Sequence, residues 1–308
     1  MCADVNNSNS QAQTGASHAE FGREISNMRE TVLMPRRKPT TICIAAICNE
    51  GSSLVLATDS MVTNEGLSIQ FEHPTRKMTH LSDSCVALTA GDALAHTELF
   101  DLVQTKIAAL KAPSIVEIVS EIKGCYQSLR EQEMKERILI PRGFDGFKQF
   151  YEAQRILIPE LVFGIQKQID DYDYGLDIIV AGICAGTAHI YGISNPGTSK
   201  CFDALGFHAI GSGLPHAINT VIARGCHEAT SLEEALLIVY EAKKTAEKAP
   251  GIGARITNIC ILTPQKLMEF PRNKLEKLHE LYEAWVRKES NWMGGVQELL
   301  NEIGGPTK

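Results

Sequence analysis

Two adjacent threonines, Thr40 and Thr41, stand directly after Pro39 at the head of an apolar segment. A threonine hydroxyl is a weak nucleophile and needs a base to accept its proton. The α-amino group of the threonine itself, with an ordinary pKa of about 8, can be that base if the threonine is the first residue. Thr40 is therefore the candidate nucleophile, and Thr41 is interpreted as a residue of the strand that follows.

An acid and a base follow at spacings that suit this chemistry. Asp59 ends the next apolar segment, and in a hairpin that end lies beside the start of the first strand. Lys77, on a later β segment, is the natural cationic partner of Asp59. Such a pair beside the threonine would lower the pKa of its hydroxyl and orient the proton transfer. Each residue type is also common in ordinary strands and turns, so the combination carries the hypothesis.

The first half of the chain changes from strand patterns to helix patterns. Apolar and β-branched residues predict a hairpin of 41–48 and 54–58, a second hairpin of 67–71 and 76–81, and a strand over 84–90. Helical spacing follows over 92–110 and from 114 to about 138. Ser114 and Glu117 form the capping box of the second helix.

The second half repeats this order. A helical insertion is expected at about 133–174. Strands are expected at 176–183, 187–193, 199–204, 207–211 and 256–262, and helices at 214–227 and 231–248. An apolar face in the tail joins Leu275, Leu278, Leu281 or Tyr282, and Trp285. This order predicts an α+β fold in which two antiparallel sheets stack with helices outside, a four-layer α/β/β/α sandwich.

Composition excludes several classes of protein. The 308 residues carry a net charge of -7 and have no basic stripe with aromatic residues, which argues against nucleic-acid binding. No apolar run reaches the roughly 18 residues of a membrane helix, so no membrane association is expected. Nine scattered cysteines without a Cys-x-x-Cys spacing argue against disulfides and zinc, and favour a cytoplasmic protein. Residues 1–39 are polar and are expected to be a disordered leader or propeptide.

Two further patterns could indicate other binding functions. The segment GSGLPHA resembles a truncated dinucleotide fingerprint, but His216 stands at its sixth position and the next acidic residues lie in a helix. The histidines at 208, 216 and 227 lack the spacing of metal ligands, so no metal is expected.

Taken together, the segments TTICIAAI, LVLATDSMVT and TRKMTHLSDSCVALTAGDALAHTELF resemble the proteasome β-subunit family of N-terminal nucleophile hydrolases and its bacterial HslV-type and Anbu-type relatives. The resemblance covers about residues 40–130 and 176–263, and it includes AIGSGLPHA and the helix after it. It implies a hydrolase domain over 40–264, with the insertion at about 133–174, and a helical extension over 265–308.

The resemblance also implies roles for individual residues. Thr40 would be the nucleophile, its freed amine the general base, and Asp59 and Lys77 the rest of the triad. The Gly91 N–H would form the oxyanion hole, and Ser212 would support the amine. Thr63 and Ala93 would offer backbone groups to an extended peptide. The first specificity pocket would favour a medium apolar side chain and would consist of Val62, Thr75, Thr79, Thr89 and Ala93.

The implied function is cleavage of peptide bonds through an acyl-enzyme at Thr40, after removal of the leader and without a cofactor. The substrate would be a peptide or protein, and the protein would assemble into a homo-oligomer such as a ring. The alternative is a non-catalytic subunit that keeps the fold as a scaffold. Two features depart from the family. Pro39 crowds the bond that Thr40 would attack. Lys248 and Gly251 also stand about where the family has an Asp-x-x-Ser motif.

Overall fold

The first two apolar segments form the centre of one sheet. The computed structural model describes residues 41–64, 69–72, 77–250 and 252–289. In it β1 (Cys43–Cys48) pairs antiparallel with β2 (Ser53–Asp59), as the sequence predicts, and every residue of both strands is buried. Strands buried on both faces read as continuous apolar runs, which is why these segments show little alternation.

Two five-stranded sheets hold most of the strands, and all their pairings are antiparallel. The first has the order β10-β1-β2-β11-β12 and the second β5-β6-β7-β8-β9. The expected α+β fold with two antiparallel sheets is thus confirmed. The remaining bounds are β3 (Met61–Asn64), β4 (Ile69–Glu72), β5 (Met78–Ser82), β6 (Cys85–Gly91), β7 (Leu176–Cys184), β8 (Thr187–Ser194), β9 (Thr198–Cys201), β10 (Phe207–Ile210), β11 (Thr257–Leu262) and β12 (Leu267–Glu269).

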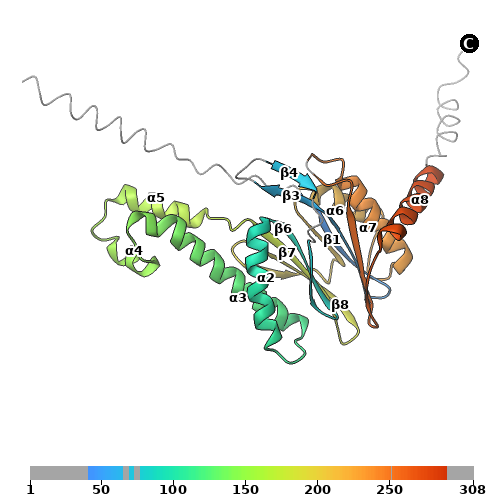
Figure 1. Ribbon diagram of the computed structural model, residues 1–308, viewed down its shortest axis with the longest axis horizontal. Helices are drawn as coiled ribbons and strands as arrows, with labels where there is room; N and C mark the ends of the chain where they lie inside the picture. The colour runs from blue at the N-terminus through green and yellow to red at the C-terminus, as the bar shows by residue number, and fades with distance from the viewer. Residues whose placement is uncertain (1–40, 65–68, 73–76, 251, 290–308) are drawn as a thin grey trace, which may run out of the picture. The chain divides into compact units, whose positions relative to one another are not determined.

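Seven α-helices lie within the described residues (Figure 1). The capping box predicted at the start of α3 is present, because Ser114 and Glu117 bond each other's backbone. Ser231 likewise caps α7 by accepting the Glu234 N–H at 3.2 Å. The helices are α2 (Ala93–Ala108), α3 (Ile115–Met134), α4 (Phe147–Ala153), α5 (Pro159–Asp170), α6 (Leu214–Ala223), α7 (Leu232–Ala246) and α8 (Arg272–Glu289).

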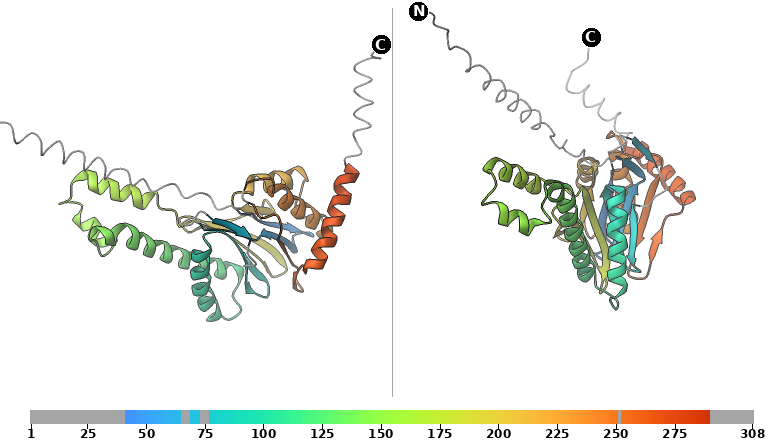
Figure 2. Two further views of the ribbon diagram at one scale, coloured as in Figure 1. Left: turned by 45° about the horizontal axis from the view of Figure 1, so that its top comes forward. Right: turned by 60° about the vertical axis from the view of Figure 1, so that its left-hand side comes forward.

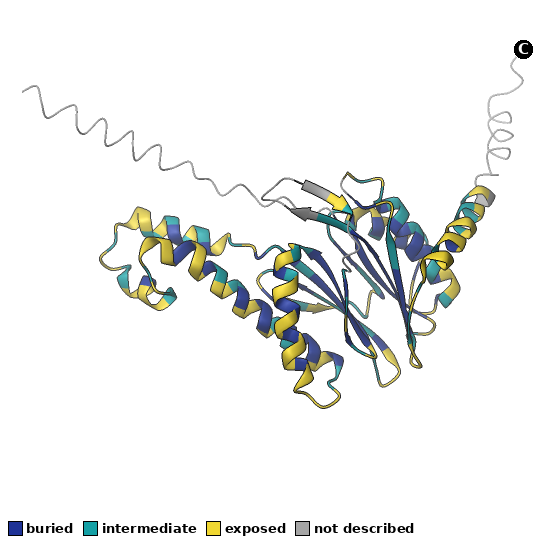
Figure 3. Cartoon of the chain, viewed as in Figure 1, coloured by how far each residue is buried: buried dark blue, intermediate teal, exposed yellow. Residues whose placement is uncertain are grey.

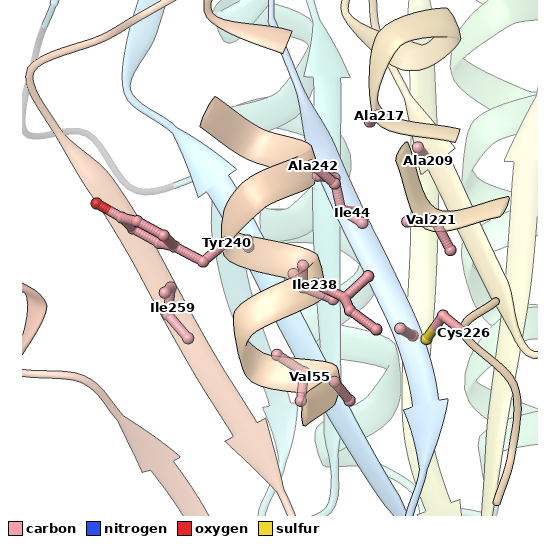
Figure 4. Close-up of a cluster of buried hydrophobic side chains, with 14 of the residues drawn as sticks. Ile44, Val55, Ala209, Ala217, Val221, Cys226, Ile238, Tyr240, Ala242 and Ile259 are labelled. Carbon is pink, nitrogen blue, oxygen red and sulfur yellow. The ribbon is translucent and has the colours of Figure 1, made fainter. Parts of the chain in front are cut away.

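Successive residues of a strand belong to different hydrophobic clusters, because their side chains point alternately to opposite faces of the sheet. Leu56 of the first sheet and Leu88 of the second belong to one buried cluster that joins the two sheets. The neighbouring Val55 belongs instead to a cluster with α6 and α7, in which Ile238 lies close to it (Figure 4). The opposite face of the second sheet packs on α2 and α3. Figure 3 shows that burial is concentrated in the strands and on the sheet-facing sides of the helices.

The expected insertion is helical and projects from the sheets (Figure 2). After α3 the chain forms a π-helical turn over Lys135–Leu139 and a 3-10 turn over Ile140–Arg142, and then α4 and α5. These helices enclose a small apolar cluster of their own, formed by Met134, Ile138, Leu139, Phe150, Ile165 and Ile169. The insertion therefore has its own core and does not depend on the sheets for all its packing.

The second predicted hairpin is wrong. Strand β4, which covers part of 67–71, pairs with β3, and β5, which covers most of 76–81, pairs with β6. Strand content was predicted correctly in both segments, but short apolar strands on either side of a turn do not reveal which neighbour they choose. Two smaller differences occur later in the chain. The strand expected at 199–204 ends at Cys201, and β12 was not predicted.

The C-terminal helix α8 packs by the predicted face. Leu278 is buried, and Leu275, Tyr282 and Trp285 pack against the cluster of the first sheet. Of the two alternatives left open by the sequence, Tyr282 lies on this face, since Leu281 is 55% exposed. Within the described ranges, no helix combines the length and apolar character needed to cross a bilayer.

The cluster between the sheets gives the first prediction. Leu56→Ala removes a fully buried side chain from the cluster shared by the two sheets and should lower the free energy of unfolding by about 2–5 kcal/mol. Leu281→Ala, on the exposed face of α8, is the matched control and should change it by less than about 0.5 kcal/mol. Urea denaturation followed by circular dichroism measures both, and equal effects would contradict the packing described.

Candidate active site

Asp59, at the end of β2, is the centre of a polar cluster. Its side chain is fully buried, and Oδ1 accepts a hydrogen bond from the Thr41 hydroxyl at 2.6 Å. The same oxygen accepts the Ile42 N–H at 3.2 Å. The register of the hairpin causes this meeting: Cys43 lies opposite Thr58, so the two residues before Cys43 lie beside Asp59. The predicted proximity of Asp59 to the start of the first strand is therefore confirmed.

The second oxygen of Asp59 is held from other parts of the chain. Oδ2 accepts the Gly253 N–H at 2.9 Å and the Met61 N–H at 3.4 Å. Burial of a carboxylate is costly unless it is paired and hydrogen-bonded. These donors, with Thr41 and Lys77, offset that cost and fix the orientation of the carboxylate.

Lys77 completes the cluster. Its ammonium lies 2.7 Å from Asp59 Oδ1 and also donates to the Thr41 hydroxyl. The N–H of Thr89 on β6 bonds the Lys77 carbonyl at 3.0 Å, which anchors Lys77 just before β5. The Thr41 oxygen thus donates to a carboxylate and accepts from an ammonium. This arrangement orients its lone pairs and stabilises negative charge that develops on it.

The threonine in this cluster is Thr41. The predicted nucleophile, Thr40, lies outside the described residues, so the structure does not test it. Thr41 was interpreted as a plain strand residue, yet it precedes β1 and bonds both members of the predicted ion pair. The structure therefore directs attention to Thr41, one residue later than the sequence pattern suggested.

The segment from Gly211 to Gly213 wraps closely around Thr41. The Gly213 N–H donates to the Thr41 carbonyl at 3.1 Å. Gly211 has a φ of +93°, and a Cβ on it would lie 2.3 Å from the same carbonyl oxygen. Gly211 is thus explained by its close backbone approach to Thr41, whereas a Cβ on Gly213 would press on the side chains of Ile42 and Ala246, each 3.1 Å away.

Ser212, predicted to support the amine, lies between these two glycines. Its hydroxyl is buried and has no hydrogen-bond partner among the residues that the structure describes. A buried hydroxyl without a partner is uncommon and calls for an explanation. It lies next to the backbone of Thr41, because Gly211 on one side of it closely approaches the Thr41 carbonyl and the Gly213 N–H on the other side bonds that carbonyl.

Gly91, predicted to form the oxyanion hole, ends β6. Its φ is +139°, and a Cβ would lie 2.1 Å from the Gly175 carbonyl oxygen, so glycine is required there for packing against the backbone. No hydrogen bond in the described part of the chain joins Gly91 to Thr41. The proposed role in the oxyanion hole is untested.

The predicted substrate-binding residues fall into two groups. Thr79 and Thr89 come from the adjacent strands β5 and β6, and Ala93 begins α2. Thr79 lies 3.2 Å from Nε2 of His96 on α2, so that helix and β5 meet at this point. Val62 and Thr63 lie on β3, but the Thr63 side chain and the whole of Thr75 lie outside the described residues.

A cysteine near the cluster is not a rival nucleophile. The Cys43 thiol donates to the Thr89 carbonyl at 3.3 Å. Complete burial raises the pKa of this thiol far above its ordinary value, so it stays protonated and unreactive at neutral pH.

Three residues that extend the site, Gly253, Lys243 and Glu247, were given no role from the sequence. Gly253 donates to Asp59, and its carbonyl accepts from the ammonium of Lys243 at 3.0 Å. Lys243 is in turn paired with Glu247. One signal was available: Lys243 sits on the apolar face of α7, four residues after Val239, where a charged residue needs a buried partner.

Comparison with known proteins assigns no family: no family model matches the chain, and no curated protein does. The arrangement around Thr41 is therefore interpreted from its own geometry.

The close approach of Gly211 gives the second prediction. Gly211→Ala and Gly225→Ala both put a side chain on a backbone with positive φ, but a Cβ on Gly225 (φ +64°) would meet nothing within 4 Å. Gly225→Ala should cost about 1–2 kcal/mol for backbone strain alone. Gly211→Ala should cost about 1–3 kcal/mol more, because it must push Thr41 aside. Urea denaturation of both variants measures the difference, and equal costs would contradict the packing at Thr41.

Proposed function

We propose that the protein is a threonine hydrolase of the N-terminal nucleophile type that cleaves amide bonds, with Thr41 as its nucleophile. One observation carries the proposal: the Thr41 hydroxyl donates to the buried Asp59 and accepts from Lys77. A hydroxyl needs this kind of support to act as a nucleophile. The resemblance to proteasome β subunits, given above, supports the same reaction.

The first chemical step of this proposal is maturation of the chain. The Thr41 Oγ1 attacks the carbonyl carbon of Thr40, and the C–N bond between the two threonines breaks. The hydroxyl proton passes to the released nitrogen, and Thr40 is left as an ester on Thr41. Water then hydrolyses this ester, which frees the leader and leaves Thr41 with both a free amine and a free hydroxyl.

Substrate cleavage follows the same path. The Thr41 hydroxyl attacks the substrate carbonyl while the α-amine accepts its proton. The amine then passes the proton to the leaving amine as the amide C–N bond breaks. Water hydrolyses the acyl ester and restores Thr41. Lys77 and Asp59 orient the hydroxyl before each attack, and the Lys77 ammonium stabilises negative charge on its oxygen.

Two features of the chain agree with Thr41 better than with Thr40. With Thr41 as nucleophile, the bond that breaks follows Thr40, and the ring of Pro39 is one residue removed from it. The unpartnered Ser212 hydroxyl also acquires a role. This hydroxyl has no partner among the described residues and lies beside the backbone of Thr41, so Ser212 is the group that would bond the amine of Thr41 once it is released.

The fold is compatible with the proposal. One apolar cluster joins the two sheets, and each sheet also packs on helices. From this we infer the four-layer α/β/β/α sandwich of N-terminal nucleophile hydrolases. The resemblance further implies a homo-oligomer such as a ring. It also implies a peptide or protein substrate held as an extended strand by Thr63 and Ala93.

The third prediction decides between the two threonines. The protein is fused to an N-terminal domain that a specific protease removes without leaving an extra residue. Two such fusions yield chains that begin at Thr41 or at Thr40. The chain beginning at Thr41 should be acylated on Thr41 by a β-lactone and should cleave peptides, because its α-amine is the required base. The chain beginning at Thr40 should be at least about 10³-fold slower until Thr41 removes Thr40, a loss of one residue that intact mass detects. Thr41→Ala should be equally slow and should never lose Thr40. Mass spectrometry of the adducts and peptide assays measure this.

Other outcomes have definite meanings. Acylation of the Thr40 chain on Thr40 would restore the first prediction from sequence and overturn the assignment to Thr41. If neither chain is labelled although both are folded, the hydrolase proposal is wrong and the scaffold alternative takes its place.

A further inference from the structure

We propose that Lys243, paired with Glu247, is a positioning residue that orients Asp59 through the backbone of Gly253. This inference rests on the proposed function, because it concerns how the carboxylate beside Thr41 is held in place. It assigns a role in the site to residues at the end of α7, on the far side of Gly253 from Asp59.

The contacts form a continuous chain. Glu247 bonds the ammonium of Lys243, which donates to the Gly253 carbonyl at 3.0 Å. The Gly253 N–H donates to Asp59 Oδ2 at 2.9 Å, and the other oxygen of Asp59 accepts the Thr41 hydroxyl at 2.6 Å. Both backbone groups of Gly253 are therefore used, one toward Lys243 and one toward Asp59.

The loop that contains Gly253, residues 252–255, is anchored at its start by Ile252, which is buried in the cluster of the first sheet and donates to the Ala249 carbonyl at 3.4 Å. Beyond Ile252, the described hydrogen bonds of its backbone all go to side chains of other elements. It is made of Ile252, Gly253, Ala254 and Arg255, and it forms no helix or strand. A second carboxylate, Glu72 on β4, accepts the Arg255 N–H at 2.8 Å. The loop is thus clamped at three points by Asp59, Lys243 and Glu72.

Gly253 is closely fitted between the two carboxylates. A Cβ on this residue would lie 3.1 Å from Asp59 Oδ2 and 3.0 Å from Glu72 Oε1. A small displacement of the loop would therefore lengthen the bond to Asp59 or press the loop against that carboxylate. Since the barrier to a reaction is sensitive to displacements of about 1 Å, fixing this loop bears on the rate.

Helix energetics alone do not account for the Lys243–Glu247 pair. Glu247 follows the last residue of α7, where the helix dipole disfavours a carboxylate. An ion pair within a helix is also less favourable when the lysine precedes the glutamate. Lys243 is fully buried, which lowers the pKa of its ammonium, while Glu247 opposes that shift. The pair is therefore retained against local costs, and its contact with Gly253 supplies the reason.

The neighbouring residue provides a matched control. Lys244 bonds the same glutamate at 2.8 Å, but no bond in the described structure joins it to the 252–255 loop. Lys243→Met and Lys244→Met both remove one ammonium from Glu247, and the first alone removes the donor to Gly253. Both variants are made as chains that begin at Thr41, so that a failure of maturation cannot imitate a loss of rate.

The fourth prediction compares these variants with the parent chain beginning at Thr41. Lys243→Met should lower kcat and the rate of β-lactone acylation by about 10- to 100-fold, with KM changed less than about threefold. Lys244→Met should stay within about twofold of the parent in both. Hydrogen exchange of the peptide containing Gly253 should become faster in Lys243→Met alone. If Lys243 contributed to stability alone, Lys243→Met would lower Tm, but kcat calculated per folded active site, as counted by titration, would not change.

A second variant keeps the test decisive if Lys243→Met does not fold. Glu247→Gln keeps an acceptor for Lys243 but removes its charge, and it should reduce kcat less than Lys243→Met does while again leaving KM unchanged. The positioning role would be overturned by full activity of a folded Lys243→Met variant. Full activity of Glu247→Gln with unchanged hydrogen exchange at Gly253 would overturn it as well. Either result would leave the hydrolase proposal intact. An inactive, unlabelled parent chain would instead overturn the hydrolase proposal, and the positioning of a catalytic Asp59 with it.

Discussion

The rest of the site depends on one constraint, the burial of the Asp59 carboxylate. A fully buried negative charge is stable only when donors surround it. Its donors come from separate parts of the chain: the start of β1, the segment before β5, the start of β3 and the loop before β11. Both sheets must therefore pack correctly before the charge is satisfied. Folding and assembly of the candidate site are for this reason the same event.

The polar groups lie where regular strand pairing stops. Within β1 and β2 most backbone groups pair with a neighbouring strand, and the side chains throughout β1 and over residues 54–57 are apolar. At Thr41, Asp59 and Gly253 the chain leaves or enters a strand, so backbone N–H groups are free to face a carboxylate. Gly211 closes the other side of Thr41, since its lack of a side chain lets the two backbones approach, and the Gly213 N–H bonds the Thr41 carbonyl. The apolar core thus determines where the site can be, and the strand ends determine what it contains.

The sequence predicted most of the fold and part of the site. The buried strands and the capped helices were readable because their patterns are local, as at Ser114 and Glu117. The meeting of Asp59 and Lys77 also followed from the hairpin and the order of strands. The partner of β4 was not readable, because pairing depends on contacts distant in sequence. Nor was the contact of Thr41 with that ion pair readable, since Thr40 and Thr41 are both polar β-branched residues and a register shift of one residue exchanges their positions.

The missing Asp-x-x-Ser motif shows how the network at Lys243 relates to this constraint. A loop with polar side chains can hold a neighbouring group by itself, whereas Ile252, Gly253 and Ala254 offer only backbone groups. A backbone N–H has a fixed direction relative to its chain, so it can orient Asp59 only if the loop itself is fixed. The loop must then be held from outside. Besides Asp59, two described side chains of other elements bond its backbone, Lys243 on one side and Glu72 on the other. A buried lysine in α7 thus bonds from outside a loop that has no polar side chain of its own from Ile252 to Ala254.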